Sequence, residues 1–369
     1  MRAIEEIDPT QRIAVVQAGV VLQNFQEEVD KHGLTFPLDL GSRGTATLGG
    51  AAATNAGGNR VIRYGMMRDM VLGLEAVLAD GTVVSSMNRL IKNNAGYDLK
   101  QLFLGSEGTL GIITRLVLRL REKPTTCNMA LVGVNDFSKV IALLRHMDRH
   151  LQGTLSAFEV MWRSFYRLVT TAPAAGKPPI GQDYAFYVLI EALGSDFATD
   201  SERFVGALEA AFEAGIVDDA AVSQSEDDCH AFWSLRDDVG QVMAGGVPIV
   251  FDISLPVDRM EHYADALSAR LNDAIGEHKL WIFGHLGDGN LHVIVQVKPQ
   301  DYAALRGVVE HIVYEPLAEC RGSVSAEHGI GLEKKPYLHL TRTETEIALM
   351  RRLKAALDPS GLLNPGKIF

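Results

Sequence analysis

The spacing of hydrophobic and polar residues changes after residue 121. Before that point, apolar residues form short runs of the kind found in strands, which we expect at 13–17, 71–78, 82–85 and 111–120. After Lys123-Pro124, strand-like runs alternate with longer amphipathic stretches that indicate helices. A chain of 369 residues with 47% hydrophobic content can bury two moderate cores. The pattern therefore predicts two domains, 1–121 and 122–369.

The second part has the pattern of an α+β domain. Strands are expected near 128–134, 184–192, 248–255 and 279–298. Amphipathic stretches at 137–150 and 201–214 predict helices between them. Asp258 to Glu261 and Thr343 to Glu346 each have the spacing of a capping box at a helix start. We expect a largely antiparallel sheet with helices on one face.

The most informative polar residues flank a predicted turn. His285 and His292 lie on either side of Asp288-Gly289, a dipeptide that tolerates the positive φ angles of a two-residue type I′ turn. Counting outward from that turn places His285 opposite His292, on the face that helices leave uncovered. Their Cβ atoms would then lie roughly 5 Å apart. Two imidazoles at this separation suit a single metal ion.

A divalent metal site needs at least one more protein ligand, and Ser325–Gly331 supplies a candidate. Glu327 offers a carboxylate, and the neighbouring glycines allow a close approach of backbone and side chains. If Glu327 binds the metal, His328 points elsewhere and is free for proton transfer. The alternative is that these histidines are ordinary half-buried strand residues and that His328 caps a turn.

Composition narrows the range of partners. A net charge of -11 repels phosphate, so neither nucleic acid nor an anionic membrane is expected as the main partner. Cys127, Cys229 and Cys320 form no C-x-x-C motif, which argues against an iron–sulfur cluster or a disulfide framework. No apolar run reaches the roughly 20 residues of a transmembrane helix, and the first residues lack a signal-peptide core. We therefore expect no transmembrane segment and a cytoplasmic location.

Small residues are concentrated between Gly41 and Gly111. Backbone N–H groups in glycine clusters can surround a pyrophosphate, because nothing blocks a close approach. Neither G-x-G-x-x-G after a first strand nor G-x-x-x-x-G-K-[ST] occurs, so a Rossmann or P-loop site is excluded. Taken alone, the glycines are equally consistent with tight turns in a β-rich domain.

Several motifs together resemble the FAD-linked oxidases of the vanillyl-alcohol oxidase fold. They are Thr45–Gly58, Leu90–Leu99, Gly105–Thr114, Gly284–His292, Ala326–Gly331 and Asp358–Lys367. Within that group, the chain is most similar to D-lactate and D-2-hydroxyglutarate dehydrogenases. The resemblance implies an α+β protein with a PCMH-type FAD-binding domain, followed by an α+β substrate-binding cap with an antiparallel sheet. Its terminal segment would return to the flavin.

The resemblance also implies roles for individual residues. Those matching FAD-binding positions are Thr47, Gly50, Asn55, Gly57, Gly58, Gly111, Ile113 and Asn364. His285, His292 and Glu327 match ligands of a divalent metal, commonly zinc, with manganese as a further candidate. His328 matches the catalytic base and Arg236 the residue that holds the substrate carboxylate. The alternative for Arg236 is a solvated ion pair with its helix neighbours.

The family's opening subdomain, which carries a glycine-rich loop around the pyrophosphate, has no counterpart in this sequence. We expect Met1 to be a misplaced start or the sequence to be truncated, and the FAD-binding domain at 1–121 to be incomplete. Two alternatives follow for the chain as written. It is a non-catalytic metal-binding remnant, or it is one part of a split enzyme.

The expected reaction is FAD-dependent, metal-assisted oxidation of a D-2-hydroxy acid to the 2-oxo acid. Two positions differ from the pattern that the resemblance implies for 2-hydroxyglutarate enzymes. Val250 and Phe251 are apolar where that pattern has a basic residue before the Asp, and Ile294 stands where it has an amide side chain. A second carboxylate would lack partners, which favours a lactate-like or apolar-tailed substrate over D-2-hydroxyglutarate. The electron acceptor stays unidentified. A metal-free flavin oxidase acting on an alcohol or amine is the rival class.

Overall fold

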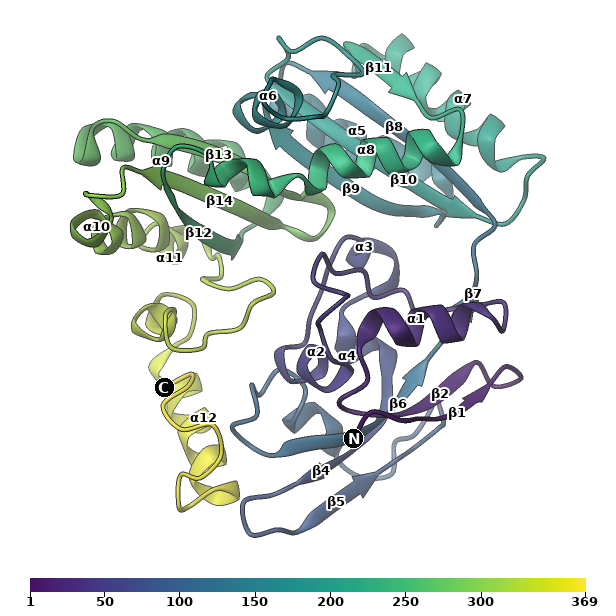
Figure 1. The fold of residues 1–369 in the computed structure, drawn as a ribbon, viewed down its shortest axis with the longest axis vertical. Coiled ribbons are helices and arrows are strands. Elements are labelled where there is room, and N and C mark those ends of the chain that lie inside the picture. The colour runs from purple at the N-terminus through teal and green to yellow at the C-terminus, as the bar shows by residue number, and fades with distance from the viewer. The chain divides into compact units, whose positions relative to one another are not determined.

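The chain forms two compact units in a computed structural model that describes residues 1–369. Unit 1 consists of Met1–Lys123 and Glu327–Phe369, and unit 2 consists of Pro124–Ala326. Unit 2 is therefore a continuous stretch of chain between two segments of unit 1. Figure 1 labels the helices and strands of both units. No helix in either unit combines the length and the apolar character needed to cross a membrane.

Unit 1 is built on a five-stranded antiparallel sheet with the order β1-β2-β6-β4-β5. Its strands are β1 (Ile4–Asp8), β2 (Ile13–Gln17), β4 (Val71–Val77), β5 (Val83–Ser86) and β6 (Ile112–Arg119), and β3 (Leu34–Thr35) pairs separately with β7 (Arg121–Glu122). The helices are α1 (Leu22–Asp30), α2 (Leu48–Thr54), α3 (Val61–Tyr64), α4 (Met67–Met70) and α12 (Glu344–Leu357). The four strands expected in this part of the chain are confirmed within two residues at each end.

Unit 2 contains a seven-stranded sheet with the order β11-β8-β10-β9-β13-β14-β12, in which every neighbouring pair is antiparallel. The strands are β8 (Thr126–Val134), β9 (Leu155–Trp162), β10 (Phe186–Gly194), β11 (Asp219–Val222), β12 (Val247–Ser254), β13 (Lys279–His285) and β14 (Asn290–Val297). The helices are α5 (Phe137–Leu151), α6 (Arg163–Thr170), α7 (Asp200–Glu213), α8 (Glu226–Asp237), α9 (Met260–Ile275), α10 (Tyr302–Tyr314) and α11 (Leu317–Cys320). The antiparallel α+β architecture is confirmed.

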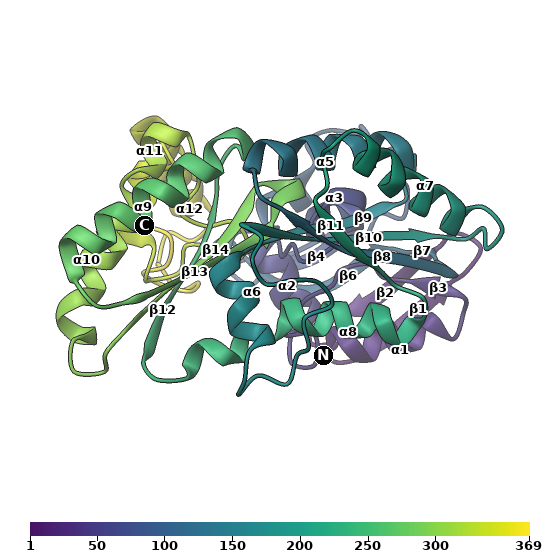
Figure 2. The ribbon, with the colours of Figure 1, turned by 90° about the horizontal axis from the view of Figure 1, so that it is seen from above.

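Helices cover both faces of this sheet, so the expectation of one covered face is wrong. Phe137 of α5 packs on Phe186, and Tyr314 of α10 packs on Phe251, on one face. On the other face, α6 and α8 form a buried cluster with alternate residues of the strands, including Phe283. Figure 2 shows α5 and α8 on opposite sides of the strands. Because both faces are covered, most strand residues of unit 2 are buried, and hydrophobic and polar residues do not alternate along these strands.

The hairpin that carries the two histidines has a different register from the expected one. His292 lies opposite Phe283, not His285, because Leu286–Asp288 form a 3-10 turn and Gly289 adopts φ +85°. The connection is thus longer than a two-residue turn, and pairing shifts by two positions. A shift of two preserves the side-chain face, since strand side chains alternate with period two. Both histidines therefore still share one face.

The two expected capping boxes have different outcomes. Thr343 and Glu346 form the box at the start of α12, with each side chain bound to the other residue's backbone N–H. Asp258 forms no such cap, because Val257–Arg259 make a 3-10 turn after Pro256 and α9 begins only at Met260.

Candidate metal centre

Two histidines of the β13–β14 hairpin meet on the face of the sheet that α6 and α8 cover. His285 ends β13 and is 5% exposed, and His292 lies diagonally across on β14. Their ring centroids are 5.3 Å apart with the planes nearly perpendicular. This face is not the uncovered one that the sequence suggested. One of the covering helices, α8, brings Arg236 to the pair.

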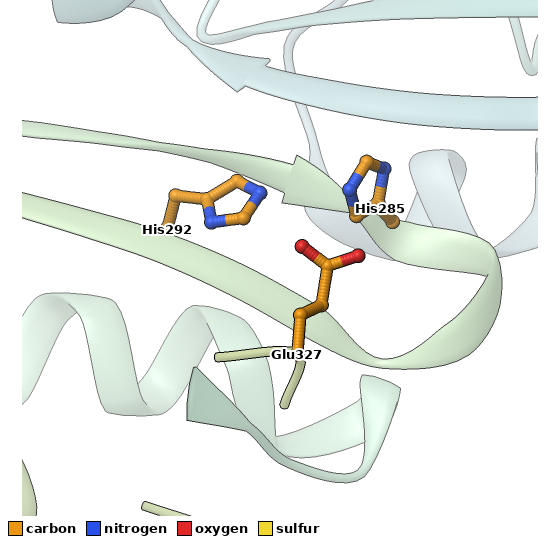
Figure 3. A group of neighbouring side chains, drawn as sticks. All are labelled: His285, His292 and Glu327. Atoms are coloured by element: carbon orange, nitrogen blue, oxygen red, sulfur yellow. The ribbon is translucent and has the colours of Figure 1, made fainter. Parts of the chain in front are cut away.

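Glu327 completes a group of three ligand-bearing residues. It directly follows Ala326, whose N–H donates to the Asp252 carboxylate at 3.2 Å. One ligand atom each of His285, His292 and Glu327 lies within 4.8 Å of the others. Figure 3 shows the carboxylate facing the two imidazoles. Two imidazole nitrogens and one carboxylate oxygen fit a catalytic zinc site, which keeps a position for substrate or water. His328, the next residue, is not one of the three.

A buried glutamate supports His285, although it is not among the site residues expected from the sequence. Glu159 lies on β9, is 1% exposed, and accepts a hydrogen bond from Nδ1 of His285 at 2.6 Å. Its second oxygen accepts one from Nε of Arg236 at 2.9 Å. Burial opposes its ionisation, but the electrostatic attraction and the hydrogen bonds of His285 and Arg236 outweigh this and lower the pKa of Glu159 to about 2. A single Glu within the apolar run 155–162 was the available signal.

Arg236 is a buried residue near the end of α8. Its side chain is 8% exposed, its guanidinium carbon lies 5.1 Å from the ring centroid of Phe283, and Nη2 lies 3.5 Å from Nε2 of His285. Of the expected alternative, a solvated helix ion pair, only part holds: Nη1 lies 3.6 Å from the Asp237 carboxylate of the same helix, but the guanidinium is buried and not solvated. The shared carboxylate of Glu159 compensates the buried positive charge, so the guanidinium is held at a fixed place beside the histidines.

Asp252 supports His292 from the neighbouring strand. It is fully buried, lies opposite His292 on β12, and its Oδ1 is 4.0 Å from Nδ1 of that ring. Asn290 donates to the same oxygen at 2.9 Å. Burial, followed by the electrostatic effects of His285 and Arg236, lowers the pKa of His292 well below its ordinary value. The neutral ring is the form that binds metal.

The chain around His328 is held by Glu107 of unit 1. The Glu107 carboxylate accepts hydrogen bonds from the N–H groups of Ile330 at 2.6 Å and Gly331 at 2.8 Å. A Cβ on Gly329 would lie 2.7 Å from that carboxylate, and φ of +77° is a conformation that residues with side chains rarely adopt, so glycine is favoured here. The backbone next to His328 is therefore tightly fixed.

The residues expected to bind FAD all lie in unit 1, around α2. Thr47 caps this helix and Asn55 ends it in the left-handed conformation, with its Oδ1 accepting the N–H of Arg68. Asn364 donates to the carbonyl of Glu107, whose N–H binds the helix end at Ala53. Gly50, Gly57 and Gly58 belong to the same stretch, and Gly111 and Ile113 lie at β6, which contacts α2.

Internal packing accounts for several of these glycines. A Cβ on Gly58 would lie 2.0 Å from the Asp39 carbonyl oxygen, and a Cβ on Gly111 would lie 2.6 Å from the Phe103 ring. The N–H of Gly58 donates to Glu327 at 2.6 Å. The fold itself therefore requires a small residue at Gly58 and Gly111. The evidence that these residues suit a flavin is that they cluster with the other expected positions around α2.

Comparisons with known proteins define the family. Residues 123–368 match the FAD linked oxidases, C-terminal domain, and residues 1–86 match the FAD binding domain. The chain belongs to the FAD-linked oxidase family. It is 43% identical to the mitochondrial D-2-hydroxyglutarate dehydrogenase of Bos taurus, over 97% of this chain and 65% of that protein. It is 37% identical to the Arabidopsis thaliana protein of the same name, over 100% of this chain and 66% of that protein. The chain thus spans about two thirds of the length of these relatives.

Solved structures agree on the fold. p-Cresol methylhydroxylase superimposes with a TM-score of 0.74 at 15% identity, over 100% of this chain and 78% of that one. Alkyldihydroxyacetonephosphate synthase superimposes with a TM-score of 0.71 at 17% identity, over 99% of this chain and 66% of that one. At these identities the likeness concerns the fold alone, and it confirms the expected fold class.

The expectation of a cytoplasmic location is wrong. The relatives from Bos taurus, Arabidopsis thaliana and Rattus norvegicus are named as mitochondrial proteins. The expectation came from the lack of a secretory signal core in the first residues, and that feature does not distinguish among other compartments.

Proposed function

We propose that the chain oxidises a D-2-hydroxy acid to the 2-oxo acid, with FAD and a divalent metal as cofactors. The metal, zinc first and manganese as the second choice, would bind at His285, His292 and Glu327. The observation that carries the proposal is the meeting of these three side chains, with ligand atoms within 4.8 Å of one another. Membership of the FAD-linked oxidases and the match of residues 1–86 to an FAD binding domain support the flavin.

In this proposal, the residues around α2 bind FAD, and Arg236 together with the metal ligands binds the substrate. When bound, the metal supplies Lewis acidity at the hydroxyl group and the flavin accepts two electrons. Arg236 holds the substrate carboxylate through paired N–H donors, and Glu159 keeps the guanidinium in place. His328 accepts the hydroxyl proton at a ring nitrogen as general base.

The substrate side chain is proposed to be small or apolar. Val250 and Ile294 lie opposite each other on β12 and β14, on the same face as Asp252 and His292. Phe251 points to the other face, where it packs on Tyr314. Neither Val250 nor Ile294 offers a second carboxylate a hydrogen bond or an ion pair, so the dicarboxylate would gain nothing from these two side chains. We therefore favour a lactate-like or apolar-tailed monocarboxylic acid.

A second candidate is D-2-hydroxyglutarate, favoured by the 43% identity to a protein with that substrate in its name. Comparing kcat/KM for D-lactate, a longer D-2-hydroxy monocarboxylate and D-2-hydroxyglutarate separates the two. Val250→Lys would supply a cation on the substrate face and is expected to shift preference towards the dicarboxylate at least tenfold, about 1.4 kcal/mol. A strong preference of the unmodified protein for D-2-hydroxyglutarate would refute the monocarboxylate proposal.

The metal is tested by His292→Ala, with His311→Ala as the control. His311 is an exposed histidine on α10 that pairs with Glu315, away from the three ligands. We expect His292→Ala to lose bound zinc and activity while flavin absorbance is retained, and His311→Ala to keep all three. Full turnover of the unmodified protein after metal removal would refute the metal-assisted mechanism and favour a metal-free flavin oxidase.

A further inference from the structure

Two cysteines that are far apart in the sequence meet where α8 packs on β8. Cys127 is the second residue of β8 and is exposed, whereas Cys229 lies on α8 and is buried. The Cys229 thiol lies 3.9 Å from the carbonyl oxygen of Cys127. The two side chains also share a hydrogen bond, which lowers the pKa of Cys229 to about 7 against the opposing effect of burial. Ionisation of Cys229 is thus favoured over that of an ordinary thiol.

We propose that Cys127 and Cys229 form an oxidation site at which hydrogen peroxide converts two thiols into one reversible disulfide. Exposed Cys127, as its thiolate, attacks one oxygen of hydrogen peroxide and breaks the O–O bond. The sulfur becomes a sulfenic acid, and the hydroxide that leaves takes up the proton given up by the thiol as the first water. The Cys229 thiolate then attacks the Cys127 sulfur, forms the S–S bond and displaces hydroxide, which takes up a proton as the second water. The two thiols lose two electrons in total, and the peroxide is reduced to two water molecules.

The third cysteine does not share this setting. Cys320 lies at the end of α11, where burial raises the pKa of its thiol and so disfavours the reactive thiolate. The proposed disulfide would join β8 covalently to α8. Arg236 follows Cys229 by seven residues, two helical turns, on this helix, so oxidation would tether the element that carries it. The site itself is independent of the proposed reaction.

The experiment treats the purified full chain with hydrogen peroxide and measures free thiols and disulfide-linked peptides by mass spectrometry. We expect the free thiols to fall from three to one, with one peptide pair linking Cys127 and Cys229, and reductant to restore all three. The Cys320→Ser variant is the matched control and should form the same link. Cys127→Ser and Cys229→Ser should each form none.

Three outcomes would overturn the proposal. The first is that all three thiols survive peroxide that oxidises free cysteine in the same solution. The second is that Cys127 or Cys229 is converted to sulfinic acid without a linked peptide. The third is that the link joins two chains, which a doubled mass on non-reducing gels would reveal.

Discussion

At the scale of single residues, Glu159 determines the geometry of the proposed site. It holds a histidine 126 positions away and an arginine 77 positions away with its two oxygens, in a place that water barely reaches. A hydrogen bond to Nδ1 fixes the tautomer of His285 and leaves Nε2 as the metal-binding atom. The same carboxylate neutralises Arg236, which would otherwise be a buried unpaired cation.

Glu159→Gln is expected to weaken both functions of this residue. Zinc affinity should fall about 10–100-fold because the support of His285 is weakened. The free energy of unfolding should fall by about 3–5 kcal/mol because Arg236 stays buried without its counter-ion. Chelator competition measures the first effect and urea denaturation the second.

The double variant Glu159→Gln/Arg236→Met separates the two effects. Removal of the unpaired cation should restore much of the stability, whereas zinc affinity should stay low. Unchanged stability in the single variant would show that Glu159 and Arg236 do not form the buried pair described above.

At the scale of elements, the β13–β14 hairpin depends on a glycine beside the first histidine. A Cβ on Gly284 would lie 2.3 Å from the backbone oxygen of Asn290, so the two strands could not keep their distance. Gly284→Ala is therefore expected to cost about 1–3 kcal/mol of unfolding free energy. Thermal and urea unfolding measure the change.

Gly307→Ala is the matched control for this substitution. Gly307 lies within α10, and a Cβ there would meet no atom within 4 Å. Because Ala is favoured over Gly inside helices, the variant should gain roughly 0.5–1 kcal/mol. Equal effects of the two substitutions would contradict the close approach at Gly284.

The end of α12 should respond to acid. The hydrogen bond from Lys354, aided by the N–H groups of Leu362 and Leu363, lowers the pKa of Asp358 to about 2 from 3.8. Since the folded-state pKa is the lower one, this contribution to stability is complete above pH 3.8 and is lost as pH falls towards 2. Asp358→Asn should remove this part of the pH dependence. Melting temperatures between pH 2 and 6 for both proteins measure it, and parallel curves would contradict the prediction.

At the scale of the whole molecule, metal binding should stabilise the folded chain. The ligands meet only in the folded state, because they lie on two strands and on a segment more than thirty residues further along. Zinc at a hundred times its Kd should therefore raise the unfolding free energy by about 2.7 kcal/mol. Calorimetry with and without chelator measures this gain, which His292→Ala should lack. Equal stabilisation of that variant would place zinc elsewhere.

The sequence predicted much of the fold from local chemistry. Apolar spacing located the unit 1 strands, and Thr343 with Glu346 marked the start of α12. It predicted the shared face of His285 and His292 although the register was wrong by two, because strand side chains alternate with period two. The turn itself was misjudged, since Leu286–Asp288 adopt a 3-10 conformation that the Asp-Gly signal does not indicate.

The sequence by itself thus determined the strands, the common face of the two histidines and the candidate third ligand, because each depends on short-range periodicity or on a local motif. Only the tertiary structure decided that Glu159, Asp252 and Arg236 surround this pair, and that helices cover both faces of the sheet. Those contacts join residues up to 126 positions apart. They form only when strand order and helix packing bring distant segments together, and no local pattern encodes that order.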